Sequence, residues 1–147
     1  MRESGIRTGF RLRDISSGSE GWLARKNGGT GPKIGSYTVV SDTLDRIGAK
    51  ALETSTSDDI DLVLVDEIGP MEMTSANFRN SLSDLLNGKK MVVATVKQGS
   101  RYGEVEKTLN SGGAVLLELT RENCNSMLQQ IISRIESRAL AEEQGTP

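Results

Sequence analysis

The hydrophobic positions of this chain follow two patterns, and their order along the chain predicts the fold. Mainly apolar runs of strand length occupy residues 60–66, 91–96 and 114–119 and are rich in branched side chains. Such runs favour strands that are buried on both faces of a parallel sheet. Between the runs, apolar residues recur every three or four positions, which is typical of amphipathic helices. Strands that alternate with helices predict a parallel sheet with right-handed crossovers.

Four helices are predicted around these strands. Ser41 is expected to cap the first, and Ser75 the second; a short third helix is expected over residues 101–110. Thr120 is expected to cap the last and longest, and residues 141–147 to form a frayed tail. The expected core positions of these helices are Leu44, Ile47, Ala51, Leu52, Phe78, Leu82, Leu85, Leu86, Val105, Leu109, Cys124, Leu128, Ile131, Ile132 and Ile135.

The segment before Ser41 has a different pattern. Residues 6–14 alternate weakly between apolar and basic side chains, which predicts a half-exposed strand with a basic outer face. A turn at residues 16–18 and a return strand over 20–25 would complete an antiparallel hairpin. Two explanations suit the arginines of this strand, a solvated strand face and a phosphate clamp, and the first is favoured.

A glycine-rich loop is predicted over residues 26–36. It departs from the phosphate-binding pattern G-x-x-x-x-G-K-[ST], because Lys33 precedes the last glycine of the segment and does not follow it. We therefore expect a surface loop here.

Composition narrows the possible chemistry. The 147 residues suit one domain, and the net charge of −2 gives no global electrostatic case for nucleic acid or an anionic membrane as a partner. Absence of histidine excludes His-based zinc sites and Ser-His-Asp catalysis, and the single cysteine, Cys124, excludes an internal disulfide. No apolar run approaches the length of a membrane span. We expect one cytoplasmic domain over residues 1–147 without a membrane partner.

Two adjacent acids, Asp66 and Glu67, end the first apolar strand. Ligands of open α/β sheets bind at the carboxyl ends of the strands, and acids there are stabilised by a cation. A strand-end carboxylate can hold Mg²⁺ on phosphates, and a neighbouring glutamate can deprotonate water. The alternative is a solvated strand end whose acids meet Lys97 or Arg101.

Residues 65–73, Val-Asp-Glu-Ile-Gly-Pro-Met-Glu-Met, resemble the Walker B region of the thermostable nucleoside-triphosphatase family, which includes the human cancer-related nucleoside-triphosphatase. Nearly the whole chain is similar to the family, in the same order. Further matching segments are Arg7-Thr8-Gly9-Phe10, Gly31-Pro32-Lys33-Ile34-Gly35-Ser36-Tyr37, Phe78-Arg79, Val93-Ala94-Thr95-Val96, Arg101-Tyr102 and Glu118-Leu119-Thr120-Arg121-Glu122-Asn123.

The resemblance implies a RecA-like P-loop fold, a three-layer α/β sheet, and Mg²⁺-dependent hydrolysis of ATP, GTP and other nucleoside triphosphates to the diphosphate. It implies that Asp66 holds Mg²⁺ through water and that Glu67 is the base. Thr95 would be a sensor of the γ-phosphate, or else an ordinary strand threonine. Lys33 and Arg101 are candidates for phosphate binding from loops. Glu72 also lies in the matching string, without an assigned role.

The sequence departs from the family in one respect. Members open with an apolar strand, a G-x-x-G-x-GK-[ST] loop and a helix, and residues 1–147 contain none of these. We therefore expect hydrolysis by these residues alone to be impaired, and the sheet to expose an apolar edge that favours self-association. Three explanations are, in order of preference, a start upstream of Met1, a degenerate copy, and an element supplied by a partner or a rearrangement.

Two other functions are alternatives to hydrolysis. The first is a non-catalytic nucleotide-fold remnant that acts through protein contacts. The second is a receiver-like phosphoacceptor domain built on Asp66, Thr95 and Lys97. That fold needs further acids at the end of an earlier strand, and the sequence has none in such a place, so the receiver reading is disfavoured.

Overall fold

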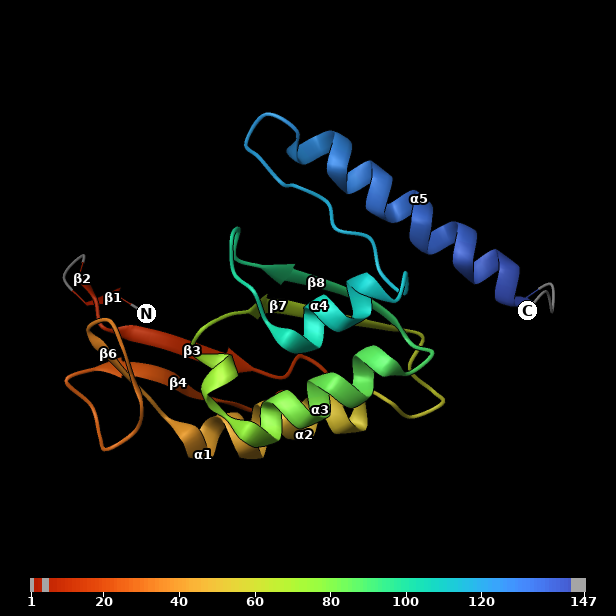
Figure 1. Ribbon diagram of the computed structural model, residues 1–147. Coiled ribbons are helices and arrows are strands. Elements are labelled where there is room, and N and C mark those ends of the chain that lie inside the picture. Colours follow the sequence, from red (N-terminus) through yellow and green to blue (C-terminus); the bar gives the residue numbers. More distant parts are fainter. Residues whose placement is uncertain (1, 4–5, 144–147) are drawn as a thin grey trace.

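The structure, a computed structural model, describes residues 2–3 and 6–143 and divides them between helices and three small sheets (Figure 1). The strands are β1 (Arg2–Glu3), β2 (Ile6–Arg7), β3 (Gly9–Arg13), β4 (Glu20–Lys26), β5 (Lys33–Ile34), β6 (Tyr37–Val39), β7 (Leu62–Ile68) and β8 (Met91–Val96). The helices are α1 (Ser41–Thr43), the π-helical η1 (Leu44–Ala49), α2 (Lys50–Thr54), the 3₁₀ turn η2 (Glu72–Thr74), α3 (Ala76–Asn87), α4 (Gly103–Asn110) and α5 (Cys124–Glu143). Among the described helices, none is long and apolar enough to cross a membrane.

The N-terminal part forms a four-stranded antiparallel sheet in the order β3-β4-β6-β5. The predicted hairpin is confirmed as β3 and β4, but the prediction of a loop over residues 26–36 is wrong in part, because β5 lies within it. Gly31 makes this possible, since a Cβ at that position would lie 1.9 Å from the carbonyl oxygen of Val39. Strands of two and three residues are too short to produce a detectable hydrophobic pattern.

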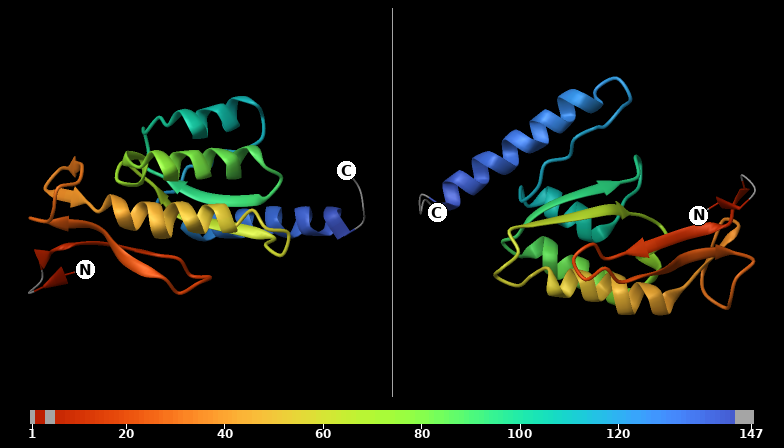
Figure 2. Two further views of the ribbon diagram at one scale, coloured as in Figure 1. Left: turned by 90° about the horizontal axis from the view of Figure 1, so that it is seen from below. Right: turned by 180° about the vertical axis from the view of Figure 1, so that it is seen from behind.

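One continuous helical segment, formed by α1, η1 and α2, packs against the inner face of this sheet (Figure 2). The N-cap is Val40 and no side chain caps the helix, so the expectation that Ser41 is the cap is wrong. Gly48 allows a close approach, because a Cβ there would lie 3.2 Å from both Leu12 and Phe78.

The central apolar strands β7 and β8 pair in parallel, with Leu64 opposite Val93 and Val65 opposite Ala94. One face of this pair packs against the helices: Val63 is buried, and the ring of Phe78 in α3 is 3% exposed. The other face is open, since 67% of Leu64 is exposed. The prediction of a strand buried on both faces is therefore wrong for β7, because the described residues supply no layer over its second face.

The helix predicted after Ser75 is confirmed. The backbone N–H of Phe78 donates to the hydroxyl oxygen of Ser75 at 3.0 Å, so Ser75 is the N-cap of α3. Leu82 and Leu85 are buried at the centre of the core.

The third strand, predicted over residues 114–119, is absent from the structure, which has no regular element there. Val115 is 62% exposed and Leu116 is 72% exposed. A strand needs a hydrogen-bonding neighbour, and none of the described strands pairs with this segment. Its apolar pattern is therefore strand-like, but the segment joins none of the described sheets.

The long helix predicted after Thr120 exists as α5, but its apolar stripe is not part of the core. Leu128 is 53% exposed and Ile132 is 38% exposed, and α5 lies apart from α2 and α3 (Figure 1). One tether is the Arg138 guanidinium, which donates to the carbonyl oxygen of Lys89 at 2.7 Å. The helix continues to Glu143, so the predicted tail begins too early; residues 144–147 lie outside the described part of the chain.

Candidate functional site

The carboxyl ends of β7 and β8 bring together two of the predicted site residues. Because the strands are parallel neighbours, Asp66 and Thr95 lie side by side at the same edge. The hydroxyl of Thr95 donates to Oδ1 of Asp66 at 2.9 Å. This hydrogen bond holds one of the two carboxylate oxygens and so limits the orientations of the Asp66 side chain.

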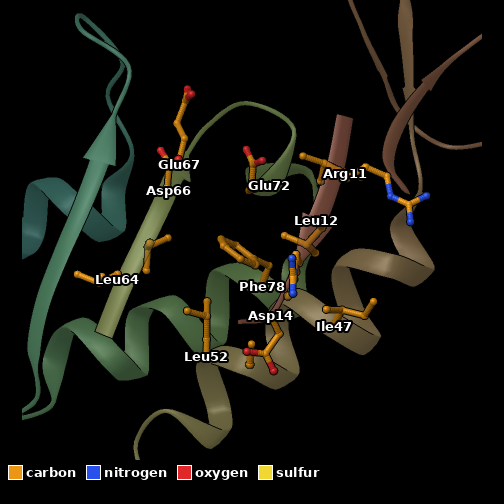
Figure 3. Close-up of a pocket in the computed structure, with 15 residues that line it drawn as sticks. Arg11, Leu12, Asp14, Ile47, Leu52, Leu64, Asp66, Glu67, Glu72 and Phe78 are labelled. Atoms are coloured by element: carbon orange, nitrogen blue, oxygen red, sulfur yellow. The ribbon is translucent and has the colours of Figure 1, made fainter. Parts of the chain in front are cut away.

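Asp66 and Glu67 also line a cavity of about 150 Å³ between β3 and β7. Figure 3 shows the carboxylates of Asp66, Glu67 and Glu72 at one end of this cavity, above the apolar side chains of Leu52 and Phe78. Arg11 and Arg13 of β3 and Asp14 are further lining residues. The cavity thus combines an acidic end with an apolar floor.

Glu72 and Glu67 approach each other around Gly69. A Cβ at Gly69 would lie 2.7 Å from Oε2 of Glu72 and 3.0 Å from Oε1 of Glu67. Burial raises the pKa of the Glu72 carboxyl, and the negative charge of Glu67 raises it further, while the backbone N–H groups of Glu72 and Gly69 oppose the rise. Glycine at position 69 lets both carboxylates lie against the turn without moving aside.

The structure separates the remaining predicted residues from this cavity. Lys33 lies on β5, opposite Thr38 of β6, in the antiparallel sheet. Arg101 is exposed and pairs with Glu106, with 3.8 Å between Nε and Oε1. Neither residue lines the cavity.

Sequence reasoning missed the residues that β3 and η2 bring to the cavity. Arg11, Arg13 and Asp14 are far from Asp66 along the chain. The alternating pattern of their own segment does not indicate that they line the same cavity as Asp66. Glu72 lies within the segment that resembles the family. The Gly-Pro turn between Glu67 and Glu72 could have indicated that the two carboxylates lie close together.

The described residues contain no cluster of three or more metal-ligating side chains. Mg²⁺ in nucleotide sites is commonly held by one or two carboxylates together with phosphates and water. Asp66, oriented by Thr95, fits such a site as a single protein ligand.

Comparison with known proteins identifies the family of the chain. A family model described as NTPase matches residues 1–132. The chain belongs to the NTPase family. The nucleoside-triphosphatase THEP1 of Thermotoga sp. (strain RQ2) is 39% identical over 133 residues, which are 90% of this chain and 75% of the relative. That of Thermofilum pendens is 35% identical over 138 residues, covering 93% and 75% of the two chains.

Two solved structures are similar to this NTPase-family chain. The crystal structure of THEP1 from Aquifex aeolicus has a TM-score of 0.78 at 30% identity and covers 88% of this chain and 78% of the other. The solution structure of a human cancer-related nucleoside triphosphatase has a TM-score of 0.73 at 26% identity, covering 93% and 78%. The mixed α/β fold is therefore that of P-loop NTPases, and the family is one of nucleoside-triphosphatases, which are hydrolases.

Proposed function

We propose that this protein takes part in the Mg²⁺-dependent hydrolysis of nucleoside triphosphates, such as ATP and GTP, to the diphosphate and phosphate. The observation that supports this most directly is the contact between Asp66 and Thr95 at the ends of two parallel strands, with Glu67 beside them. Membership of the NTPase family gives the class of substrate.

In the proposed reaction, Glu67 accepts a proton from the water that attacks the γ-phosphorus, so that the bond between the β–γ bridging oxygen and the γ-phosphorus breaks. Asp66 would hold Mg²⁺ through water, and Thr95 keeps the Asp66 carboxylate in one orientation. Mg²⁺, when bound, neutralises charge that develops on the phosphate oxygens. Thr95 would contact the γ-phosphate only by turning its single hydroxyl proton away from Asp66, and Lys33 and Arg101 would need to move to reach the phosphate.

The experiment uses two proteins, because residues 1–147 contain no G-x-x-G-x-GK-[ST] loop. One is the chain as given; the other carries, in front of Met1, an apolar strand, a G-x-x-G-x-GK-[ST] loop and a helix of the kind with which the family opens. We expect the extended protein to release phosphate from ATP with Mg²⁺, and residues 1–147 to do so far more slowly, because backbone amides and a lysine of that loop cradle the phosphates.

Glu67→Gln in the extended protein is expected to lower kcat by about 10²-fold or more, since proton transfer to a positioned base contributes that much. Binding of ATP, measured by calorimetry, should stay unchanged. Glu136→Gln on the exposed surface of α5 is the matched control. Normal turnover by Glu67→Gln would remove Glu67 as the base.

A second candidate is a non-catalytic nucleotide-fold protein that acts through protein contacts. The exposed apolar side chains Leu64, Val115 and Leu116 favour it. It predicts that residues 1–147 show no ATP affinity by calorimetry, and Mg²⁺-dependent binding in the micromolar range would contradict it.

A further inference from the structure

The outer face of the antiparallel sheet carries a group of cations around the single tryptophan of the chain. Arg11 and Trp22 are cross-strand partners on β3 and β4, and Gly9 pairs with Arg25 beside them. Partners in antiparallel strands point to the same face. The inner partners of this sheet, such as Phe10 and Ala24, point to the core instead. We call the outer set, Arg11, Arg13, Trp22, Arg25 and Lys33, the arginine–tryptophan face.

Trp22 is held in place by its neighbours on this face. The ring lies against Gly9, where a Cβ would come 2.9 Å from Cζ3 of Trp22. The guanidinium carbon of Arg11 lies 5.1 Å from the ring centroid, and that of Arg25 lies 5.0 Å from it. Trp22 remains half-exposed. A rigid strand therefore presents an aromatic surface between two planar cations.

Positive charge extends along the face beyond the tryptophan. Arg25 and Lys33 both pair with Thr38, one from each side, which places them two strand spacings, or about 10 Å, apart. Arg11 pairs with Glu20, but Arg13, Arg25 and Lys33 make no ion pair within the described chain. Residues 7–39 hold six Lys/Arg and two Asp/Glu in a chain whose net charge is −2. The charge is thus concentrated on this sheet.

We propose that the arginine–tryptophan face binds single-stranded nucleic acid, with a base stacked on Trp22 and phosphates on Arg13, Arg25 and Lys33. An open sheet surface with an aromatic residue and flanking cations is the arrangement that single strands use, because stacking needs only the flat face of a base and cations follow the backbone. A free nucleotide is better served by an enclosed pocket, and this face is open to solvent on the side away from α1 and α2 (Figure 2). Arg11 and Arg13 also line the cavity beside Asp66 and Glu67, whereas Trp22, Arg25 and Lys33 do not, so the variants that test the proposal are made at these last three residues.

Fluorescence tests the proposal directly, since Trp22 is the only tryptophan. Oligouridylate and oligothymidylate of roughly 12 nucleotides, within the usual site size, are titrated against residues 1–147 at low salt. We expect quenching of Trp22 by one or both, and log K to fall with log salt at a slope of about −2, as three phosphate contacts imply. The two oligonucleotides distinguish RNA from DNA as the source of the strand.

Variants then locate the contact. Trp22→Ala should weaken binding, measured by anisotropy of a labelled oligonucleotide, by about five- to hundredfold. Arg25→Ala and Lys33→Ala keep the tryptophan and should each reduce the salt slope by about 0.7. Arg134→Ala on α5 is the control for non-specific attraction and should change neither quantity. Circular dichroism checks that each variant is folded.

Three results would overturn the proposal. They are the absence of quenching at low salt, an equal loss of affinity in Arg134→Ala and Arg25→Ala, and quenching of Trp22 by UMP at concentrations as low as those of the oligonucleotides. The last result would assign the face to a free nucleotide.

Discussion

At the scale of single residues, Glu72 is the side chain whose environment is most informative. Its pKa is raised by burial and by Glu67, so in the folded state it binds a proton more tightly than in the unfolded state. A carboxyl with a raised folded pKa costs stability as pH rises above its unfolded value, because the unfolded chain ionises first. The other charged residues that line the same cavity are Arg11, Arg13, Asp14, Asp66 and Glu67.

Glu72→Gln removes this ionisation while keeping the shape of the side chain. We expect the Tm of the variant to exceed that of the original protein by about 1–3 °C at pH 7.5, and the difference to shrink towards pH 4, where both side chains are neutral. Thermal unfolding at the two pH values gives the comparison. Glu136→Gln, on α5, should show no such pH dependence, and an equal gain at both pH values would contradict the explanation.

Residue-scale predictions from the sequence succeeded where the signal was local. Asp66 and Thr95 were expected at the ends of neighbouring strands, and parallel pairing does place them in contact. Lys33 was proposed near phosphates from its loop, but its place is fixed by pairing with β6, which no short-range pattern reveals. The Mg²⁺ site at Asp66, the role of Glu67 as the base and the phosphate contacts of Thr95, Lys33 and Arg101 stay predictions.

At the scale of elements, the N-cap of α3 is the contact most open to a stability test. The Ser75 hydroxyl accepts from the N–H of Phe78 and donates to Oδ1 of Asp45 at 2.6 Å, and Ser75 is buried. It therefore joins α3 to η1 as well as starting the helix.

Ser75→Ala is expected to lower the free energy of unfolding by about 1–2 kcal/mol, the usual cost of losing a cap. Urea unfolding followed by circular dichroism measures it. Asn80→Ala, at an exposed position of the same helix, should change it by less than about 0.5 kcal/mol. Equal effects of the two substitutions would show that Ser75 is not an energetically important cap.

Helices with a local start signal and a buried stripe, such as α3, were predictable from sequence. Residues 114–119 were not, because an apolar pattern does not decide whether a segment pairs, and this one pairs with none of the described strands. The same holds for α5, whose stripe was correctly identified as apolar but has no described surface to cover it. The apolar pattern of a segment predicts which side chains it can bury, but burial also requires a neighbouring element that covers them.

At the scale of the whole molecule, the apolar surfaces left open favour self-association. β7 and β8 form a two-stranded sheet, so each has one edge without a strand partner in the described chain, and Leu64 lies on the open face. Unpaired edges and exposed apolar faces both promote association. Ile132 of α5 adds to the exposed area.

We expect the mass of residues 1–147 to rise with concentration in light scattering after gel filtration. Leu64→Glu combined with Ile132→Glu should weaken the association by at least about tenfold, or 1.4 kcal/mol. Thr30→Glu is the control, because Thr30 is exposed in the segment between β4 and β5 and does not line the cavity beside β7. A mass that stays monomeric at all concentrations would contradict this expectation.

The π-helical stretch η1 has a consequence for the lengths of related chains. A π turn holds one more residue than the α-helical turn that spans the same part of a helix. We therefore expect that removal of one residue from η1 restores a regular α-helix. Leu44, at the start of η1, and Leu52, in α2, would then both still face the core. A gap of one residue in relatives should be tolerated here, whereas the same gap inside α3 would rotate Leu82 and Leu85 out of the core.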